Sequence, residues 1–215
     1  MPSLREINEK TRRAYNLAAQ TYHDLFHDEM NEKAYDRELL DRFARPFGRD
    51  SLVCDAGCGP AAHIGRYVAD KGIPVVGVDI SDRCVELAGR FNPGMRVVRA
   101  ERGRLPFAGG TFAGAIAYYA IIDTPKRHVG RIFRELHRVL KPGGLLLTAV
   151  KAGADEGFQP ELLGMAAEIW FTRFSEKEIA GYFRRAGFEL EFIETRDPYG
   201  FEIQNERIFA IGRRK

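Results

Sequence analysis

The stretch Leu52-Val53-Cys54-Asp55-Ala56-Gly57-Cys58-Gly59-Pro60-Ala61-Ala62 decides the fold of this 215-residue chain. It begins as a short apolar strand, turns through two glycines and enters a helix. Gly57 and Gly59 let the backbone approach a ligand closely, because a Cβ would obstruct that approach. A strand, a glycine-rich turn and a helix in this order predict an adenosine-type cofactor at the carboxyl edge of a parallel sheet.

Two carboxylates near this turn indicate what kind of cofactor it binds. Asp79 ends the next apolar strand, where a carboxylate can accept hydrogen bonds from both ribose hydroxyls. Asp55 lies two residues before Gly57 and would repel a diphosphate, which otherwise binds at the helix N-terminus. It suits a positively charged group, such as the ammonium or sulfonium of S-adenosylmethionine. The alternative is that Asp55 only hydrogen-bonds its own turn.

The rest of the chain predicts an α/β fold. Short apolar strands over 51–55, 74–79, 95–98, 112–119 and 145–150 alternate with helices, which favours a parallel sheet covered on both faces. Strands over 188–194 and 202–211, joined by a loop over 195–200, predict an antiparallel C-terminal hairpin. We therefore expect a Rossmann-like three-layer sandwich with a mostly parallel seven-stranded sheet. Residues 1–45 are expected to form an N-terminal helical lid, and 46–215 one globular unit.

Composition excludes several classes of protein. The chain is 45% hydrophobic and 29% charged, with a net charge of +3, which argues against disorder and against a nucleic-acid partner. The three cysteines lack the spacing of a zinc knuckle, and His23 and His27 fit a solvated helix face better than a metal site. No signal-peptide core or membrane span is evident. We expect a cytoplasmic monomer or homodimer without bound metal and without a membrane partner.

Five motifs, in order, resemble the class I S-adenosylmethionine-dependent methyltransferases, specifically the small bacterial methyltransferase-domain proteins. The resemblance covers most of the chain, from about Tyr22 to the end. The motifs are Asp55-Ala56-Gly57-Cys58-Gly59-Pro60, Val75-Val76-Gly77-Val78-Asp79-Ile80-Ser81, Leu105-Pro106-Phe107, Arg138-Val139-Leu140-Lys141-Pro142-Gly143-Gly144 and Ala186-Gly187-Phe188.

The resemblance implies a role for each matching position in binding S-adenosylmethionine, whose product is S-adenosylhomocysteine. The methionine part would be lined by Asp55, Gly57, Cys58 and Gly59. The adenosine part would be held by Asp79 at the ribose, Ile80 against the adenine, Glu101 at the adenine amino group and the backbone N–H of Arg102. Tyr119 and Ala120 would lie beside the methyl group, and Tyr22 would close over the cofactor. The chain departs from the family pattern at four positions. Ala61 replaces a glycine, Glu101 an aspartate, Ala113 an acid and Asp123 a histidine.

The acceptor side is less defined by the sequence. Asp123 is the candidate base, because the loop after the fourth strand faces the methyl group, and Tyr119 is a second catalytic candidate. The alternative is that Asp123 caps the helix that begins near Pro125-Lys126. Trp170, Arg173 and Tyr199 are expected to roof the acceptor pocket, although Trp170 is equally compatible with the core.

The sequence favours methyl transfer to an oxygen or nitrogen of a small molecule. An NAD(P)-dependent oxidoreductase is one alternative, but it gives Asp55 no role and needs a hydride-transfer constellation such as Tyr-x-x-x-Lys. A non-catalytic S-adenosylmethionine-binding protein is the other. The sequence does not identify the acceptor.

Overall fold

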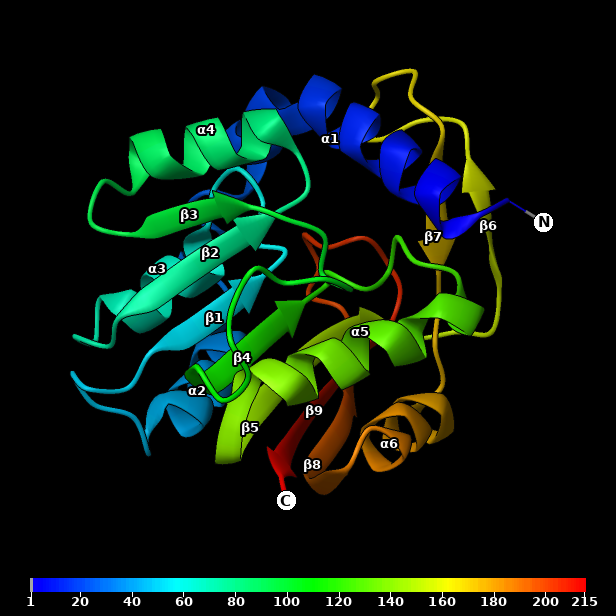
Figure 1. The fold of residues 1–215 in the computed structure, drawn as a ribbon. Coiled ribbons are helices and arrows are strands. Elements are labelled where there is room, and N and C mark those ends of the chain that lie inside the picture. The colour runs from blue at the N-terminus through cyan, green and yellow to red at the C-terminus, as the bar shows by residue number, and fades with distance from the viewer. Residues whose placement is uncertain (1) are drawn as a thin grey trace.

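The architecture is a large central sheet with helices on both faces and a small separate sheet. Residues 2–215, which a computed structural model describes, form a seven-stranded sheet and a two-stranded sheet (Figure 1). The large sheet contains β1 (Val53–Ala56), β2 (Val75–Asp79), β3 (Arg96–Arg99), β4 (Phe112–Tyr118), β5 (Leu140–Lys151), β8 (Phe188–Arg196) and β9 (Arg207–Arg214). The small sheet contains β6 (Glu156–Gln159) and β7 (Ile169–Thr172).

The strand order is β3-β2-β1-β4-β5-β9-β8. In this sheet of the described chain, β9 runs in the direction opposite to the other six strands. This confirms the predicted mostly parallel sheet with a C-terminal hairpin. The chain winds outward from β1 on one side and from β4 on the other. Cys54 pairs with both Val76 and Ala115, so the carboxyl ends of β1, β2 and β4 meet at one edge. In open α/β sheets this reversal of strand order leaves a crevice in which ligands bind.

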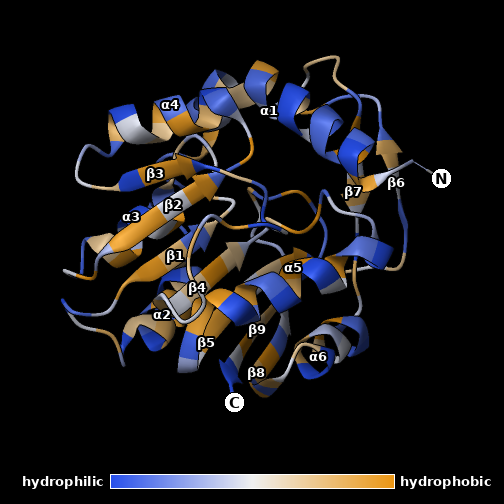
Figure 2. Ribbon diagram, in the orientation of Figure 1, coloured by the Kyte–Doolittle hydropathy of each residue, from blue (hydrophilic) through white to orange (hydrophobic). Residues whose placement is uncertain are grey.

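The helices form the two outer layers. They are α1 (Leu4–Phe26), α2 (Ala34–Ala44), α3 (His63–Ala69), α4 (Asp82–Phe91), α5 (Lys126–Val139) and α6 (Glu176–Arg185), with a short 3₁₀ turn η1 (Glu29–Asn31). Side chains of α2, α3 and α4 share one apolar cluster with the sheet, and those of α5 and α6 share another. The strands are mostly hydrophobic and the helices carry polar outer faces (Figure 2). The three-layer prediction is therefore confirmed.

Helix α1 crosses the carboxyl edge of the sheet above α4, β3 and β2 (Figure 1). It begins at Ser3, whose side chain forms a reciprocal capping box with Glu6. Asn16 fastens the helix to the chain that follows β2, because its Oδ1 accepts hydrogen bonds from Ser81 Oγ at 2.6 Å and from the Arg83 N–H at 3.2 Å. The N-terminal helix is thus fixed against the segment that the sequence assigns to cofactor binding.

The C-terminal third differs from the sequence prediction in two places. Strand β9 begins at Arg207 instead of residue 202, so the hairpin loop runs over 197–206. The reason is that Glu202 pairs with buried cations instead of joining the strand. The two strands of the small sheet were not predicted. Within residues 2–215, no helix has the length and apolar character needed to cross a membrane.

Candidate cofactor and acceptor site

The glycine turn after β1 is tied to the end of β2 by its backbone. The N–H groups of Gly57 and Cys58 donate to the Val78 carbonyl oxygen at 2.7 and 3.0 Å. Gly57 has a φ of +104°, and a Cβ there would lie 2.5 Å from the Cβ of Ala120. No side chain fits at that distance, so the turn after β1 and the end of β4 approach each other as only glycine allows.

Asp79 is buried at the end of β2 and is fixed by two backbone donors. Its Oδ2 accepts from the Gly59 N–H at 3.0 Å and its Oδ1 from the Ser81 N–H at 2.9 Å. Burial raises the pKa of Asp79, and the Ser81 N–H and the Arg102 charge counteract that rise. Each carboxylate oxygen retains a second lone pair, so the carboxylate can still accept from two ribose hydroxyls. The arrangement fits a ribose.

Asp55 lies beneath the turn and is 1% exposed. Its Oδ2 accepts a hydrogen bond from the Gly65 N–H of α3 at 3.0 Å. Burial raises the pKa of Asp55 to about 7, although the Gly65 hydrogen bond acts in the opposite direction. A buried carboxylate without a cationic partner is costly to ionise, and a positively charged ligand would stabilise the ionised form. The hydrogen bond reaches α3 and lies outside Asp55's own turn, and the role of Asp55 in binding a positive group stays a prediction.

Arg102 and Asp123 form an ion pair across the turn. A guanidinium nitrogen of Arg102 hydrogen-bonds the Asp123 carboxylate, and another lies 3.3 Å from the place of a Gly57 Cβ. Burial raises the pKa of Asp123, and the Arg102 charge opposes it. We expected Arg102 to act through its backbone; the structure places its side chain beside the cofactor turn.

The capping role considered for Asp123 is wrong. Helix α5 has Pro125 at its N-cap and no side-chain cap hydrogen bond there. Instead, the Lys126 N–H donates to a Glu156 carboxylate oxygen of β6 at 2.7 Å. The small sheet, which sequence reasoning missed, thus supplies the acceptor for the first turn of α5. Asp123 as a base stays a prediction.

A cleft of about 420 Å³ lies between α1 and the ends of β2 and β3. Ile80 and Glu101, which the sequence assigns to the adenine, both line it. Tyr22 lies nearer the turn, because its Cε1 is 3.8 Å from the place of a Gly59 Cβ. Two of the predicted adenosine residues, Ile80 and Glu101, are thus brought together at one opening that α1 borders. Among residues 2–215, no cluster of three or more His, Cys, Asp and Glu side chains is arranged for a metal ion.

The three residues expected to roof the acceptor are held by different neighbours. Trp170 Nε1 donates to Thr172 Oγ1 at 2.9 Å within the small sheet. Arg173 pairs with Asp155. The Tyr199 hydroxyl accepts from a backbone N–H of α2 at 2.9 Å. The structure does not gather them into one pocket, and their roles as substrate residues stay predictions.

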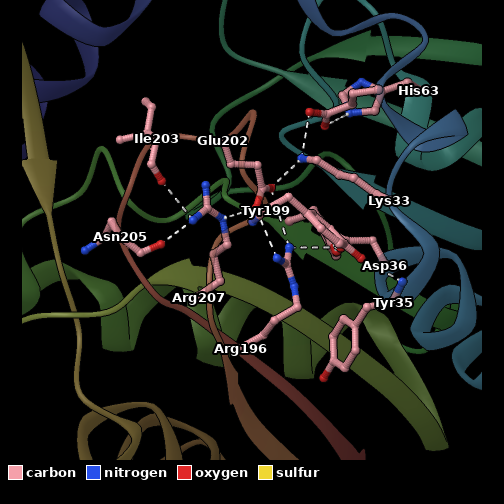
Figure 3. Close-up of polar contacts among 12 residues, drawn as sticks. Lys33, Tyr35, Asp36, His63, Arg196, Tyr199, Glu202, Ile203, Asn205 and Arg207 are labelled. Atoms are coloured by element: carbon pink, nitrogen blue, oxygen red, sulfur yellow. Dashed lines mark hydrogen bonds and ion pairs between the residues drawn. The ribbon is translucent and has the colours of Figure 1, made fainter.

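A buried ion network lies at the same edge of the sheet, beyond β5 (Figure 3). It joins η1 and α2 to the loop between β8 and β9. Glu202 is its centre, with Lys33, Arg196 and Arg207 at 3.0, 3.0 and 3.2 Å. Although burial acts against it, hydrogen bonds from Arg196, from the Tyr199 N–H and from Lys33 lower the pKa of Glu202 to about 2. Sequence reasoning missed this network because its members are scattered from residue 29 to residue 207.

Tyr119 and Lys151 stand next to this network. Tyr119 has a φ of +51°, and its buried hydroxyl has no hydrogen-bond partner in the part of the chain that the structure describes. Lys151 ends β5 and places its Nζ 4.9 Å from the centre of the Tyr119 ring. The sequence analysis also did not select Lys151. The signal that could have found it is a lysine directly after a buried apolar strand.

The chain is similar to known proteins in both sequence and fold. Residues 53–144 match the methyltransferase domain family. The malonyl-[acyl-carrier protein] O-methyltransferase of Enterobacter lignolyticus is 33% identical over 135 residues, which are 62% of this chain and 50% of that protein. The chain spans about half the length of the curated relatives it matches.

Solved structures share the fold. The Burkholderia thailandensis 1,6-didemethyltoxoflavin-N1-methyltransferase has a TM-score of 0.77 at 18% identity, covering 100% of this chain and 92% of that one. The [4+2]-cyclase SpnF has a TM-score of 0.67 at 18% identity, covering 85% and 81%. Residues 53–144 thus carry a methyltransferase domain, and the whole chain has the fold of the S-adenosylmethionine-dependent methyltransferases of known structure.

Proposed function

We propose that the protein transfers the methyl group of S-adenosylmethionine to an oxygen or nitrogen of a small-molecule acceptor. The observation that carries this proposal is the Asp79 carboxylate, fixed by two backbone N–H groups beside a turn that only glycine allows. The residues fit the cofactor, because the carboxylate keeps lone pairs for a ribose and the neighbouring cleft has room for an adenine.

The cofactor, when bound, supplies an already activated methyl group. The protein therefore has to bind it, orient the acceptor and exclude water. Asp55 would face the positive charge of the methionine part, Asp79 would hold the ribose, and Ile80 with Glu101 would border the adenine. Asp123 is the proposed base for an acceptor that must lose a proton. Its pairing with Arg102 means that the base has to be released from this ion pair first.

The names of the relatives support the reaction class but differ in acceptor. The E. lignolyticus relative is named an O-methyltransferase and the B. thailandensis structure an N1-methyltransferase. A small acceptor is consistent with both names. The cyclase among the structural neighbours shows that the same fold also serves another reaction class, so a non-catalytic or differently catalytic protein is the second candidate.

The oxidoreductase alternative has no support in the structure. The Tyr-x-x-x-Lys spacing does occur, at Tyr67 and Lys71. Both side chains contact Asp41 of α2, at the end of α3 that is remote from the glycine turn. Asp55 beneath that turn remains unfavourable for a diphosphate.

Calorimetry with S-adenosylmethionine, S-adenosylhomocysteine and NADH tests the proposal. We expect both sulfur compounds to bind and NADH not to bind. Release of S-adenosylhomocysteine is then measured across a panel of small carboxylic acids, phenols and amines. Binding of NADH in preference to the sulfur compounds would contradict the cofactor assignment. Tight cofactor binding without turnover on any acceptor would favour the second candidate.

A further inference from the structure

The charges around Lys151 leave it without a partner. The adjacent network contains three lysine or arginine cations and three carboxylates, which are Lys33, Arg196, Arg207, Glu29, Asp36 and Glu202. These six pair among themselves. Lys151 forms no ion pair or hydrogen bond through Nζ with any described residue, 2–215, and its recorded contact is the Tyr119 ring.

The surroundings of Lys151 make that surplus charge unfavourable. It pairs in register with Arg207 on β9, so two cations stand opposite each other on neighbouring strands. Burial, together with the charges of Arg207 and Lys33, lowers the pKa of Lys151 to about 8, although the charges of Glu202 and Glu29 act in the opposite direction. A half-buried ammonium beside a second cation is stabilised by an additional anion that pairs with it.

Tyr119 supplies a second polar group at this place. Its ring lies under Lys151, and its hydroxyl is buried without a partner in the described chain. Buried hydroxyl groups in proteins are usually hydrogen-bonded, so an unpartnered one indicates a ligand or water. Tyr119 directly precedes Ala120, which packs against the turn at Gly57. The backbone of Tyr119 is therefore one residue from the contact with the turn that we assign to the cofactor, and the charges that act on its hydroxyl are those of the Glu202 network.

We propose that Lys151 and Tyr119 together bind a carboxylate of the acceptor, with the ammonium pairing with the anion and the phenol donating a hydrogen bond to it. This inference rests on the proposed function and narrows its acceptor to acidic small molecules. If the bound oxygen itself receives the methyl group, the O–C bond forms as the C–S bond breaks. The electron pair remains on sulfur, and no proton has to be removed.

The test measures Lys151 directly in the full-length protein. Lysine side chains are labelled by reductive methylation with ¹³C-formaldehyde, and their resonances are followed by NMR during titrations of pH and of small acids. Lys151→Arg assigns the Lys151 resonance. Lys141, exposed at the other end of β5, is the matched control within the same strand. Acetate with acetamide and benzoate with benzamide are the probes, each with and without S-adenosylhomocysteine.

We expect the acids to move the Lys151 resonance and raise its titration midpoint, whereas the neutral amides and the Lys141 resonance show no change. Tyr119→Phe should weaken the apparent affinity for the acids severalfold, and Lys151→Met should abolish saturable binding. Equal effects of acids and amides, or no effect of either acid, would overturn the inference. Calorimetry with S-adenosylhomocysteine on the same samples tests the cofactor assignment separately. Because the acids are also titrated without S-adenosylhomocysteine, failure of acid binding can be distinguished from failure of cofactor binding.

Discussion

We predict that Asp55 makes the affinity for the cofactor depend on pH. Burial raises its pKa from the usual 3.8 to about 7 in the ligand-free protein. A cationic methionine part is expected to bind the ionised form, so affinity should fall below pH 7 and approach a loss of about tenfold per pH unit once the carboxyl is mostly protonated. With half of the carboxyl ionised at pH 7 and about 1% at pH 5, the expected loss is about fiftyfold.

The assay is calorimetry with S-adenosylhomocysteine between pH 5 and 7, where its amino and carboxyl groups keep their charges. The control ligand is 5′-methylthioadenosine, which keeps the adenosine part and lacks the amino-acid part. Its affinity should vary little over the same range, and Asp55→Asn should remove most of the pH dependence for S-adenosylhomocysteine. Equal pH dependence for both ligands, or none for either, would refute the assignment of Asp55 to the positive charge.

The same carboxyl predicts the pH dependence of folding without ligand. Its raised pKa means that the folded state binds more protons than the unfolded state between pH 4 and 7. Stability from this group is therefore greatest at low pH and decreases as pH rises through about 7. A shift of about 3 units corresponds to about 4 kcal/mol. The Asp55→Asn variant should accordingly gain free energy of unfolding over the wild type at pH 8, and gain less at pH 5. Urea titrations of both proteins at the two pH values measure this difference.

Three further substitutions test other parts of the site. Asp79→Ala should weaken S-adenosylhomocysteine binding about tenfold or more, the scale of a hydrogen bond to a charged group; unchanged affinity in calorimetry would contradict the ribose assignment. Asp123→Asn should lower kcat about 10²-fold or more on an acceptor that loses a proton, but less than tenfold on an acceptor already anionic. Equal losses on both acceptors would contradict a base role. Glu202→Gln should lower the free energy of unfolding by about 3 kcal/mol or more, because it leaves buried cations without their common partner. The exposed neighbour variant Glu206→Gln is its control, and an equal loss in both would contradict the network's contribution.

Local sequence features were sufficient for the parallel sheet and the cofactor turn. Glycines with positive φ at 57 and 59, an acid at the end of the second strand and alternating apolar strands each act within a few residues. Ser81 and Ser175 are the N-caps of α4 and α6, and such a cap likewise depends only on residues two or three positions away. The structural effect of such features depends on neighbouring residues in the sequence and not on distant parts of the chain.

Positions that depend on long-range partners could not be predicted in this way. Asp123 precedes a helix and had a plausible local role as its cap, but it pairs with Arg102 across the turn. Glu202 was assigned to a strand, but Lys33 just before α2 and arginines of β8 and β9 hold it in a loop. In both cases the charged side chain is buried, where pairing with an opposite charge outweighs a local preference.

The sequence by itself therefore determined the fold class and the cofactor edge, because both follow from short-range backbone geometry and hydrophobic periodicity. Only the tertiary structure showed the groups from which we infer the acceptor side. It brought Tyr119, which directly follows β4, and Lys151, which ends β5, to the same place and left both polar groups without a partner in the described chain. No spacing in the sequence encodes that meeting, since it depends on how β4, β5 and β9 pair.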